Sequence, residues 1–181
     1  MTPVQTRAAN VRLLVLDVDG VLTDGRLYYS DSGEELKAFN IKDGLGIKLL
    51  QKAGVSVAII TGRQSAIVTR RAGELGIQEV VQGREDKRQA LQELSQRCGL
   101  QVDECAYMGD DLPDLGAIVA AGFGMTVADA CAEVRSVADW QSTLSGGAGA
   151  VREACEFLLN ARGAWSATTS EFDGFRADRD A

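Results

Sequence analysis

The chain has 181 residues and a formal net charge of −7, from 19 basic and 26 acidic side chains, which argues against a nucleic-acid-binding protein. It contains no histidine, and this excludes Ser-His-Asp catalysis, Cys-His catalysis and zinc sites built on histidine. Apolar residues make up 45% of the chain, as in ordinary globular domains, and the length suffices for one domain with a full core.

Two further features of the sequence bear on the cellular location of the protein and on the redox state of its cysteines. No apolar run reaches the length needed to span a bilayer, and residues 1–10 lack the apolar core of a signal peptide, so a cytoplasmic location is expected. The four cysteines form no CxxC pair, which favours buried, reduced thiols over disulfides or zinc ligands.

Apolar patterning and turn residues predict the elements in chain order. A polar lead-in over residues 1–10 precedes a buried strand at 11–16, a β-hairpin over about 25–40, a helix from 43 to about 53 and a strand at 55–60. There follow a helix at 64–75 capped by Gly76, a strand at 79–81, a helix at 85–98 and a strand at 105–108. The pattern ends with a helix to about 121, a strand at 122–127, a helix at 131–137, a flexible glycine-rich joint at 146–149 and a helix at 151–160.

Strands that alternate with helices predict a doubly wound α/β domain with a mostly parallel sheet over residues 1–162. The β-hairpin is a small insertion, and no interior linker divides the chain into two domains. Residues 163–181 are polar and weakly patterned, and we expect them to form a flexible C-terminal tail.

Polar residues stand at the ends of three predicted strands, and in a parallel sheet these ends lie on one edge, where ligands bind. Asp17 and Asp19 follow the first strand, and carboxylates this close repel each other unless a cation or a shared proton relieves them. A simple Asp/Gly turn is the alternative interpretation of this short stretch. The full set comprises Asp17 and Asp19, Thr61 to Arg63, and Asp110, Asp111 and Asp114.

Oxygen ligands of this kind suit Mg²⁺. Thr61 offers a hydroxyl for a phosphate oxygen, and Gly62 lets the backbone approach a ligand closely. Lys87 falls in the first turn of its predicted helix, where a cation opposes the helix dipole, so a nearby anion would favour it there. A solvated surface lysine is the alternative.

Four motifs, taken in order, resemble those of the haloacid dehalogenase superfamily: Asp17-Val18-Asp19-Gly20-Val21-Leu22-Thr23, Ile60-Thr61-Gly62-Arg63, Lys87, and Gly109-Asp110-Asp111-Leu112-Pro113-Asp114. Within it, the chain is similar to the small cap-less sugar-acid phosphatases. It most resembles those that hydrolyse 3-deoxy-D-manno-octulosonate 8-phosphate (KDO 8-phosphate) in lipopolysaccharide precursor synthesis. The likeness runs from about residue 11 to about residue 159, and Ile41-Lys42-Asp43-Gly44 and Gly146-Gly147 add to it.

The resemblance implies a Mg²⁺-dependent phosphomonoesterase that works through an aspartyl-phosphate. Asp17 would be the nucleophile, and Asp19 would protonate the leaving sugar and then deprotonate water. The Asp17 side chain, the Asp19 main-chain carbonyl and Asp110 would hold Mg²⁺. The other residues would bind phosphate or substrate (Thr61, Gly62, Arg63, Arg71 and Lys87) or orient the groups around them (Asp111 and Asp114).

The stretch between the first two motifs holds little more than the hairpin and one helix, which leaves no room for a cap domain. The hairpin and the glycine-hinged C-terminus are therefore the candidates to cover the site of a neighbouring subunit. The resemblance implies a homotetramer whose hairpins join into a central barrel. Cross-strand packing within the hairpin is the expected role of Tyr28 and Tyr29.

Two positions depart from the pattern of the family. Cys131 stands where a histidine is common, and Ala148 stands where an arginine is common, so the protein would either do without that arginine or use Arg152 or Arg162. Three other interpretations stay open: the same chemistry on another sugar acid, such as a nine-carbon ulosonate 9-phosphate, a phospho-acceptor signalling domain, and a non-catalytic oligomerisation module related to sugar-nucleotide synthetases. The complete set of acidic motifs disfavours the last two.

Overall fold

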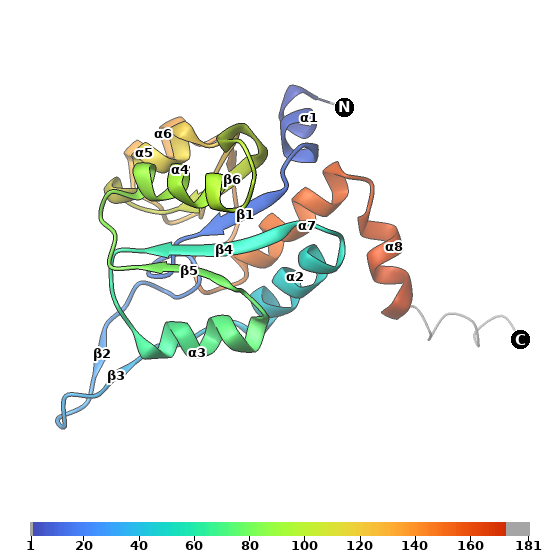
Figure 1. Ribbon diagram of the computed structural model, residues 1–181. Coiled ribbons are helices and arrows are strands. Elements are labelled where there is room, and N and C mark those ends of the chain that lie inside the picture. Colours follow the sequence, from blue (N-terminus) through green and yellow to red (C-terminus); the bar gives the residue numbers. More distant parts are fainter. Residues whose placement is uncertain (1, 173–181) are drawn as a thin grey trace, which may run out of the picture.

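The computed structural model describes residues 2–172, apart from the side chain of Glu171, and they form a doubly wound α/β fold (Figure 1). Within this range the main sheet has six strands, all paired in parallel, in the order β5-β4-β1-β6-β7-β8. The strands are β1 (Leu13–Leu16), β4 (Ser56–Thr61), β5 (Glu79–Gln82), β6 (Cys105–Gly109), β7 (Phe123–Thr126) and β8 (Trp140–Gln141). The predicted fold class is confirmed.

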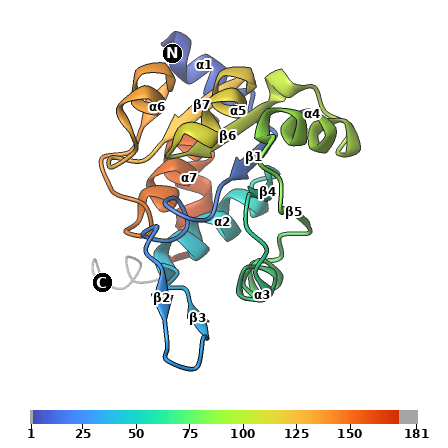
Figure 2. The same ribbon diagram turned by 90° about the vertical axis from the view of Figure 1, so that its left-hand side faces the viewer.

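Helices cover both faces of the sheet. One face carries α2 (Ile41–Lys52), α3 (Ala66–Leu75) and α7 (Ala150–Ala161), and the other carries α4 (Lys87–Arg97), α5 (Leu115–Ala120) and α6 (Ala132–Val137) (Figures 1 and 2). A sheet covered on both faces is buried throughout, which explains why β1 and β6 show continuous burial in place of a polar–apolar alternation.

The central strand, β1, leads directly into the first of the predicted site motifs. Its last residue, Leu16, pairs with Ile59 of β4 on one side and with Met108 of β6 on the other. The carboxyl ends of these three strands therefore nearly coincide. The segments that follow them start side by side at one edge of the sheet, as the sequence predicts.

A small antiparallel hairpin, β2 (Tyr28–Tyr29) and β3 (Glu35–Leu36), lies between β1 and α2 and projects away from the sheet (Figure 2). Its register pairs Tyr28 with Leu36 and Tyr29 with Glu35. Between β1 and α2 the chain forms only a turn and this hairpin, so no cap domain is present at this position.

Several short elements were not predicted. The amino-terminal segment forms α1 (Pro3–Ala9), because Thr2 and Gln5 bond to each other's backbone amides in a capping box. Strand β8 adds two residues to the sheet. Beyond α7, the helix α8 (Trp165–Thr169) and a 3₁₀ turn (Ser170–Phe172) occupy the first part of the expected flexible tail, whose residues 173–181 lie outside the described residues.

The glycine-rich segment before α7 differs from the flexible joint that its composition predicts. A Cβ atom on Gly146 would lie 1.8 Å from the carbonyl oxygen of Gly20. The Gly147 amide donates a hydrogen bond to the Val21 carbonyl at 3.0 Å. The segment thus forms a tightly packed support beneath the loop that follows β1, and small residues allow the close approach of the two backbones.

Two expectations from the sequence concern the state of the cysteines and the presence of membrane-spanning helices. Cys105 and Cys155 are buried, Cys98 and Cys131 are half-buried, and all four are free thiols. Over residues 2–172, no helix combines the length and the apolar character needed to cross a membrane.

Candidate active site

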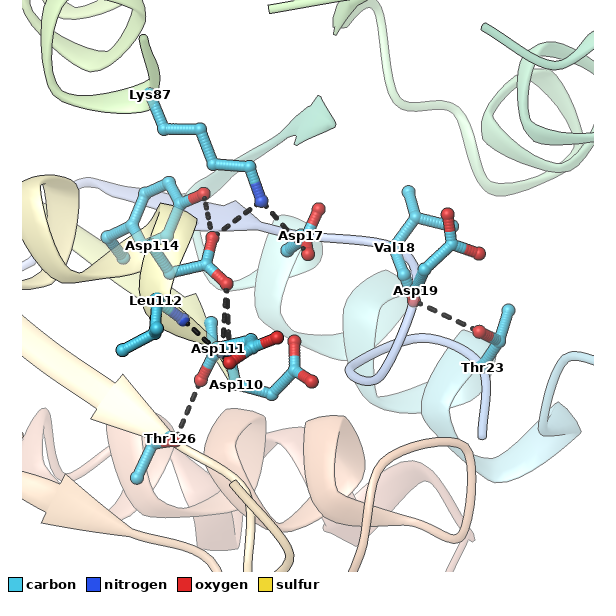
Figure 3. A network of polar contacts seen from close by, with 12 residues as sticks. Asp17, Val18, Asp19, Thr23, Lys87, Asp110, Asp111, Leu112, Asp114 and Thr126 are labelled. Atoms are coloured by element: carbon cyan, nitrogen blue, oxygen red, sulfur yellow. Dashed lines mark hydrogen bonds and ion pairs between the residues drawn. The ribbon is translucent and has the colours of Figure 1, made fainter. Parts of the chain in front are cut away.

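A buried cluster of charged side chains lies where β1 and β6 end (Figure 3). Lys87 enters it from the first turn of α4, and its Nζ lies 3.0 Å from Asp17 Oδ2 and 2.7 Å from Asp114 Oδ1. All three residues are buried. Because burial of a lysine is costly without compensating anions, the position of Lys87 depends on these two carboxylates. The interpretation of Lys87 as a solvated surface lysine is wrong.

Asp114 is held in place by the turn that carries it. Its Oδ2 accepts hydrogen bonds from the backbone amides of Asp110 and Asp111, at 3.1 and 3.3 Å. Its Oδ1 accepts a hydrogen bond from the Tyr107 hydroxyl at 2.8 Å, in addition to the one from Lys87. Both oxygens are therefore engaged, and Asp114 orients Lys87 and the turn after β6.

The cluster carries more negative charge than Lys87 balances. Burial, and then the charge of Asp114, raise the pKa of Asp17 to about 7 against the opposing effect of Lys87. Burial and the charges of Asp114 and Asp17 also raise the pKa of Asp110 to about 7. Burial by itself would lower the pKa of Lys87, but the charges of Asp17 and Asp114 outweigh it and raise the pKa. A further cation would therefore stabilise the ionised carboxylates.

The side chains present fit a hard divalent cation. One oxygen each from Asp17, Asp110 and Asp114 lies within 4.8 Å of the others, and Asp17 Oδ1 is buried without a hydrogen-bond partner. Gly20 has a φ of +94°, and a Cβ there would lie 2.1 Å from Asp110 Oδ2, so glycine leaves the space that this carboxylate occupies. Since Asp114 already uses both oxygens, Asp17 and Asp110 are the side-chain ligands available.

Asp19 contacts a different lysine from Asp17. Its carboxylate pairs with the Nζ of Lys37, which follows β3 of the hairpin. The loop that carries Asp19 is fixed locally by a hydrogen bond from the Thr23 hydroxyl to the Val18 carbonyl at 3.3 Å (Figure 3). The two aspartates of the first motif thus face separate partners, although they stand only two residues apart.

The predicted residues after β4 occupy the same edge of the sheet. Thr61, the last residue of β4, is buried. A Cβ on Gly62 would lie 3.0 Å from a carboxylate oxygen of Glu85. The half-exposed side chain of Arg63 turns to the hairpin and donates a hydrogen bond to Glu35 at 3.0 Å.

Arg71 lies on α3, and its contacts are with Glu74 and Phe39. It donates to Glu74 at 3.2 Å, and its guanidinium carbon lies 5.8 Å from the centre of the Phe39 ring. Its Nε is buried without a hydrogen-bond partner. The structure therefore brings Asp17, Lys87, Asp110 and Asp114 into one cluster, and Arg63 and Arg71 make their contacts outside it.

Asp111, Arg152 and Arg162 make contacts that lie outside the charged cluster. Asp111 is exposed, and its carboxylate accepts a hydrogen bond from the Leu112 amide at 2.8 Å, so it caps the 3₁₀ turn Leu112–Asp114. Arg152 pairs with Glu156 on its own helix. Arg162 donates to the carbonyls of residues 9 and 11, before β1 and so at the opposite edge of the sheet.

Sequence reasoning missed the roles of Lys37 and Tyr107. The pattern places Lys37 in the hairpin and Tyr107 in a buried strand, but it does not name the partner of either side chain. The Asp43 of the Ile41–Gly44 motif also has a structural partner, since its carboxylate accepts a hydrogen bond from the Arg152 amide at 2.8 Å and so caps α7.

Comparison with known proteins decides the family. A family model for haloacid dehalogenase-like hydrolases matches residues 40–122. The 3-deoxy-D-manno-octulosonate 8-phosphate phosphatase of Salmonella typhi is 45% identical over 162 residues, which are 90% of this chain and 86% of that protein. The chain belongs to the KDO 8-phosphate phosphatase family.

Solved structures of family members agree with this assignment. The phosphatase of Moraxella catarrhalis, in complex with a magnesium ion, a phosphate ion and KDO, matches with a TM-score of 0.93 and 46% identity over 95% of this chain and 99% of that one. The cobalt-bound phosphatase of Haemophilus influenzae matches with a TM-score of 0.86 and 41% identity over 89% of this chain and 94% of that one. The resemblance predicted from the four motifs is confirmed.

Proposed function

We propose that this chain is a Mg²⁺-dependent phosphatase that hydrolyses KDO 8-phosphate to KDO and inorganic phosphate. The observation that carries the proposal is the state of Asp17, whose Oδ2 lies 3.0 Å from Lys87 while its Oδ1 is buried without a partner. A carboxylate can attack phosphorus without a separate base once it is ionised, and Lys87 favours the ionised form. The named activity of relatives that share about 45% of their sequence supports the substrate.

The reaction needs two proton transfers, and we assign both to Asp19. In the first step, an Asp17 oxygen bonds to phosphorus, the bond from phosphorus to the sugar oxygen breaks, and Asp19 gives its proton to that oxygen. In the second step, water attacks the phosphorus of the aspartyl-phosphate and gives a proton to Asp19, and phosphate leaves with Asp17 restored. The ion pair with Lys37 favours the ionised form of Asp19, which is the form that accepts the proton from water in the second step.

Asp17, Asp110 and the main-chain carbonyl of Asp19 would hold Mg²⁺. The ion, when bound, would offset the repulsion between the Asp17 carboxylate and the phosphate and polarise the phosphoryl group. Lys87 would place a second positive charge on the phosphoryl oxygens, and Thr61 would donate a hydrogen bond to one of them. Asp114 would keep Lys87 in position, which its hydrogen bonds to the turn support.

The sugar acid would lie between this cluster and the base of the hairpin. Arg63 is half-exposed there, and its planar guanidinium matches a carboxylate. Arg71 lies on α3, and its Nε has no hydrogen-bond partner within the described part of the chain. Both arginines are proposed to bind the substrate on these grounds.

The substrate is tested by phosphate release from KDO 8-phosphate and from a nine-carbon ulosonate 9-phosphate, with Mg²⁺ and with EDTA. We expect many turnovers per site, loss of activity with EDTA, and a kcat/KM at least about tenfold higher for the eight-carbon acid. A preference for the nine-carbon acid would move the proposal to that substrate. Failure to release phosphate from either acid would favour a phospho-acceptor domain or an oligomerisation module instead.

We also propose a homotetramer built through the hairpins. Apolar side chains are exposed on the hairpin and the start of α2, and such a patch favours burial against other copies of the chain. Its members are Leu27, Tyr28, Tyr29, Leu36, Ile41 and Leu45. A cytoplasmic location is proposed as well, since the four free thiols suit a reducing compartment.

A further inference from the structure

Lys37 is a buried charge on an otherwise exposed hairpin. Leu36 beside it is 61% exposed and Tyr29 on the opposite strand is 64% exposed, whereas only 2% of the Lys37 side chain is accessible. A hairpin of this size has no core of its own in which to bury a side chain. Because a buried ammonium group is costly without a partner, the contacts that Lys37 makes must hold it in this position.

Those contacts connect the hairpin to the two ends of the proposed substrate site. The Nζ of Lys37 pairs with Asp19, and it lies 3.5 Å from Glu35 Oε1. The same Glu35 oxygen accepts a hydrogen bond from Arg63 at 3.0 Å. Charges of alternating sign thus run from Asp19 through Lys37 and Glu35 to Arg63 along the base of the hairpin.

We propose that Lys37 is a positioning residue for Asp19, which it holds in the orientation needed for proton transfer to the leaving sugar oxygen. The inference rests on the proposed phosphatase function. Proton transfer requires the carboxyl to lie within hydrogen-bond reach of the reacting oxygen. The Asp19 side chain is 23% accessible, so it has room to turn, and the pair with Lys37 restricts that rotation.

Two substrates separate this role from a general effect on the site. The leaving alkoxide of KDO 8-phosphate is a strong base and needs the proton from Asp19, whereas p-nitrophenolate is a weak base and leaves without it. The ratio kcat/KM reports only the steps up to the first irreversible one, which is formation of the aspartyl-phosphate. A fault in Asp19 orientation should therefore lower kcat/KM for the sugar phosphate alone.

The experiment compares Lys37→Met, Lys37→Arg and Asp19→Asn with the full-length wild-type chain. Lys37→Met is expected to lower kcat/KM for KDO 8-phosphate about 100-fold, and for p-nitrophenyl phosphate less than about threefold. Lys37→Arg keeps a cation in place and should recover at least about tenfold of the loss on KDO 8-phosphate. Lys48→Met, which removes the same charge from an exposed position of α2, is the matched control and should leave both ratios unchanged.

A double-mutant cycle tests whether Lys37 acts through Asp19. In the Asp19→Asn background, Lys37→Met should cost less than about twofold on KDO 8-phosphate, because the group it positions is already lost. Inhibition by the product KDO, and the oligomeric state by light scattering, should be unchanged by Lys37→Met.

Three results would overturn the inference: equal losses on both substrates, full additivity with Asp19→Asn, or weaker inhibition by KDO. The last would show that Lys37 binds the sugar directly. If the wild-type chain hydrolyses neither substrate, the proposed function fails. If the wild-type chain hydrolyses both substrates and Lys37→Met has the same kcat/KM values, only the proposed role of Lys37 fails.

Discussion

The substitution Asp110→Asn tests whether unbalanced negative charge in the carboxylate cluster destabilises the folded chain. In the folded chain, burial and the charges of Asp114 and Asp17 raise the Asp110 pKa from 3.8 to about 7. An increase of this size corresponds to about 4 kcal/mol against the ionised form. Because Asp110 is only half-buried, solvent screening reduces the expected contribution to about 2 kcal/mol.

The direction of the pKa change decides how the free energy of unfolding depends on pH. The folded pKa lies above the unfolded one, so the folded chain holds more protons between about pH 4 and pH 7. The free energy of unfolding therefore falls as the pH rises through this range, and the whole penalty is present above it. Asparagine cannot ionise and keeps nearly the same shape, so the variant escapes this loss.

Urea unfolding followed by circular dichroism, with EDTA present, measures the effect. At about pH 8 we expect Asp110→Asn to be about 2 kcal/mol more stable than the wild-type chain, with the difference gone near pH 4. Adding Mg²⁺ should stabilise the wild-type chain more than the variant, because ligand binding adds to folding stability. Asp111→Asn makes the same charge change at an exposed site and should shift stability by less than about 0.5 kcal/mol.

Asp110 does not carry an unfavourable charge in the folded chain if the variant is no more stable than the wild-type chain at about pH 8 without metal. A stability gain that does not change with pH would contradict such a charge equally, since the gain would then come from something other than ionisation.

Two further predictions concern the parts of the fold around the cluster. Gly146→Ala should destabilise the chain by about 2–3 kcal/mol and lower kcat, because its Cβ would meet the Gly20 carbonyl at 1.8 Å and displace the loop that carries Asp19. Gly73 lies on α3 in open space, and the matched control Gly73→Ala should be neutral or stabilising by up to about 1 kcal/mol. Thermal unfolding and steady-state kinetics compare the two variants, and equal effects of Gly146→Ala and Gly73→Ala would contradict close packing at Gly146. Replacing residues 27–36 by a short linker should give monomers in light scattering with little activity on the sugar phosphate, whereas a tetramer would contradict the assembly proposed here.

The architecture and the location of the site could be predicted from the sequence, because both follow from local patterns of residues. The buried run before Asp17 is short and ends in a turn, which marks a parallel strand, and strand ends in such a sheet share one edge. The clusters around Asp17, Thr61 and Asp110 were therefore predicted to meet. The place of Lys87 at the start of a helix favoured a nearby anion but left a solvated surface lysine as the alternative.

Contacts that depend on packing between distant segments could not be predicted in this way. The hairpin pattern gives no direction for the Lys37 side chain, which turns inward and pairs with Asp19. Tyr107 lies in a strand of buried residues, and nothing local marks its hydroxyl as the partner of Asp114. The segment around Gly146 was interpreted as flexible from composition, although its glycines serve close backbone packing.

The central claim is that Asp17 forms the covalent intermediate, and acid quenching of the enzyme during turnover tests it most directly. After reaction with KDO 8-phosphate and Mg²⁺, the quenched chain should carry one phosphoryl group, which peptide mass spectrometry should place on Asp17. Asp17→Asn should remain folded, carry no such group and release no phosphate. A phosphoryl group on any other residue, or phosphate release by Asp17→Asn at the wild-type rate, would contradict the account.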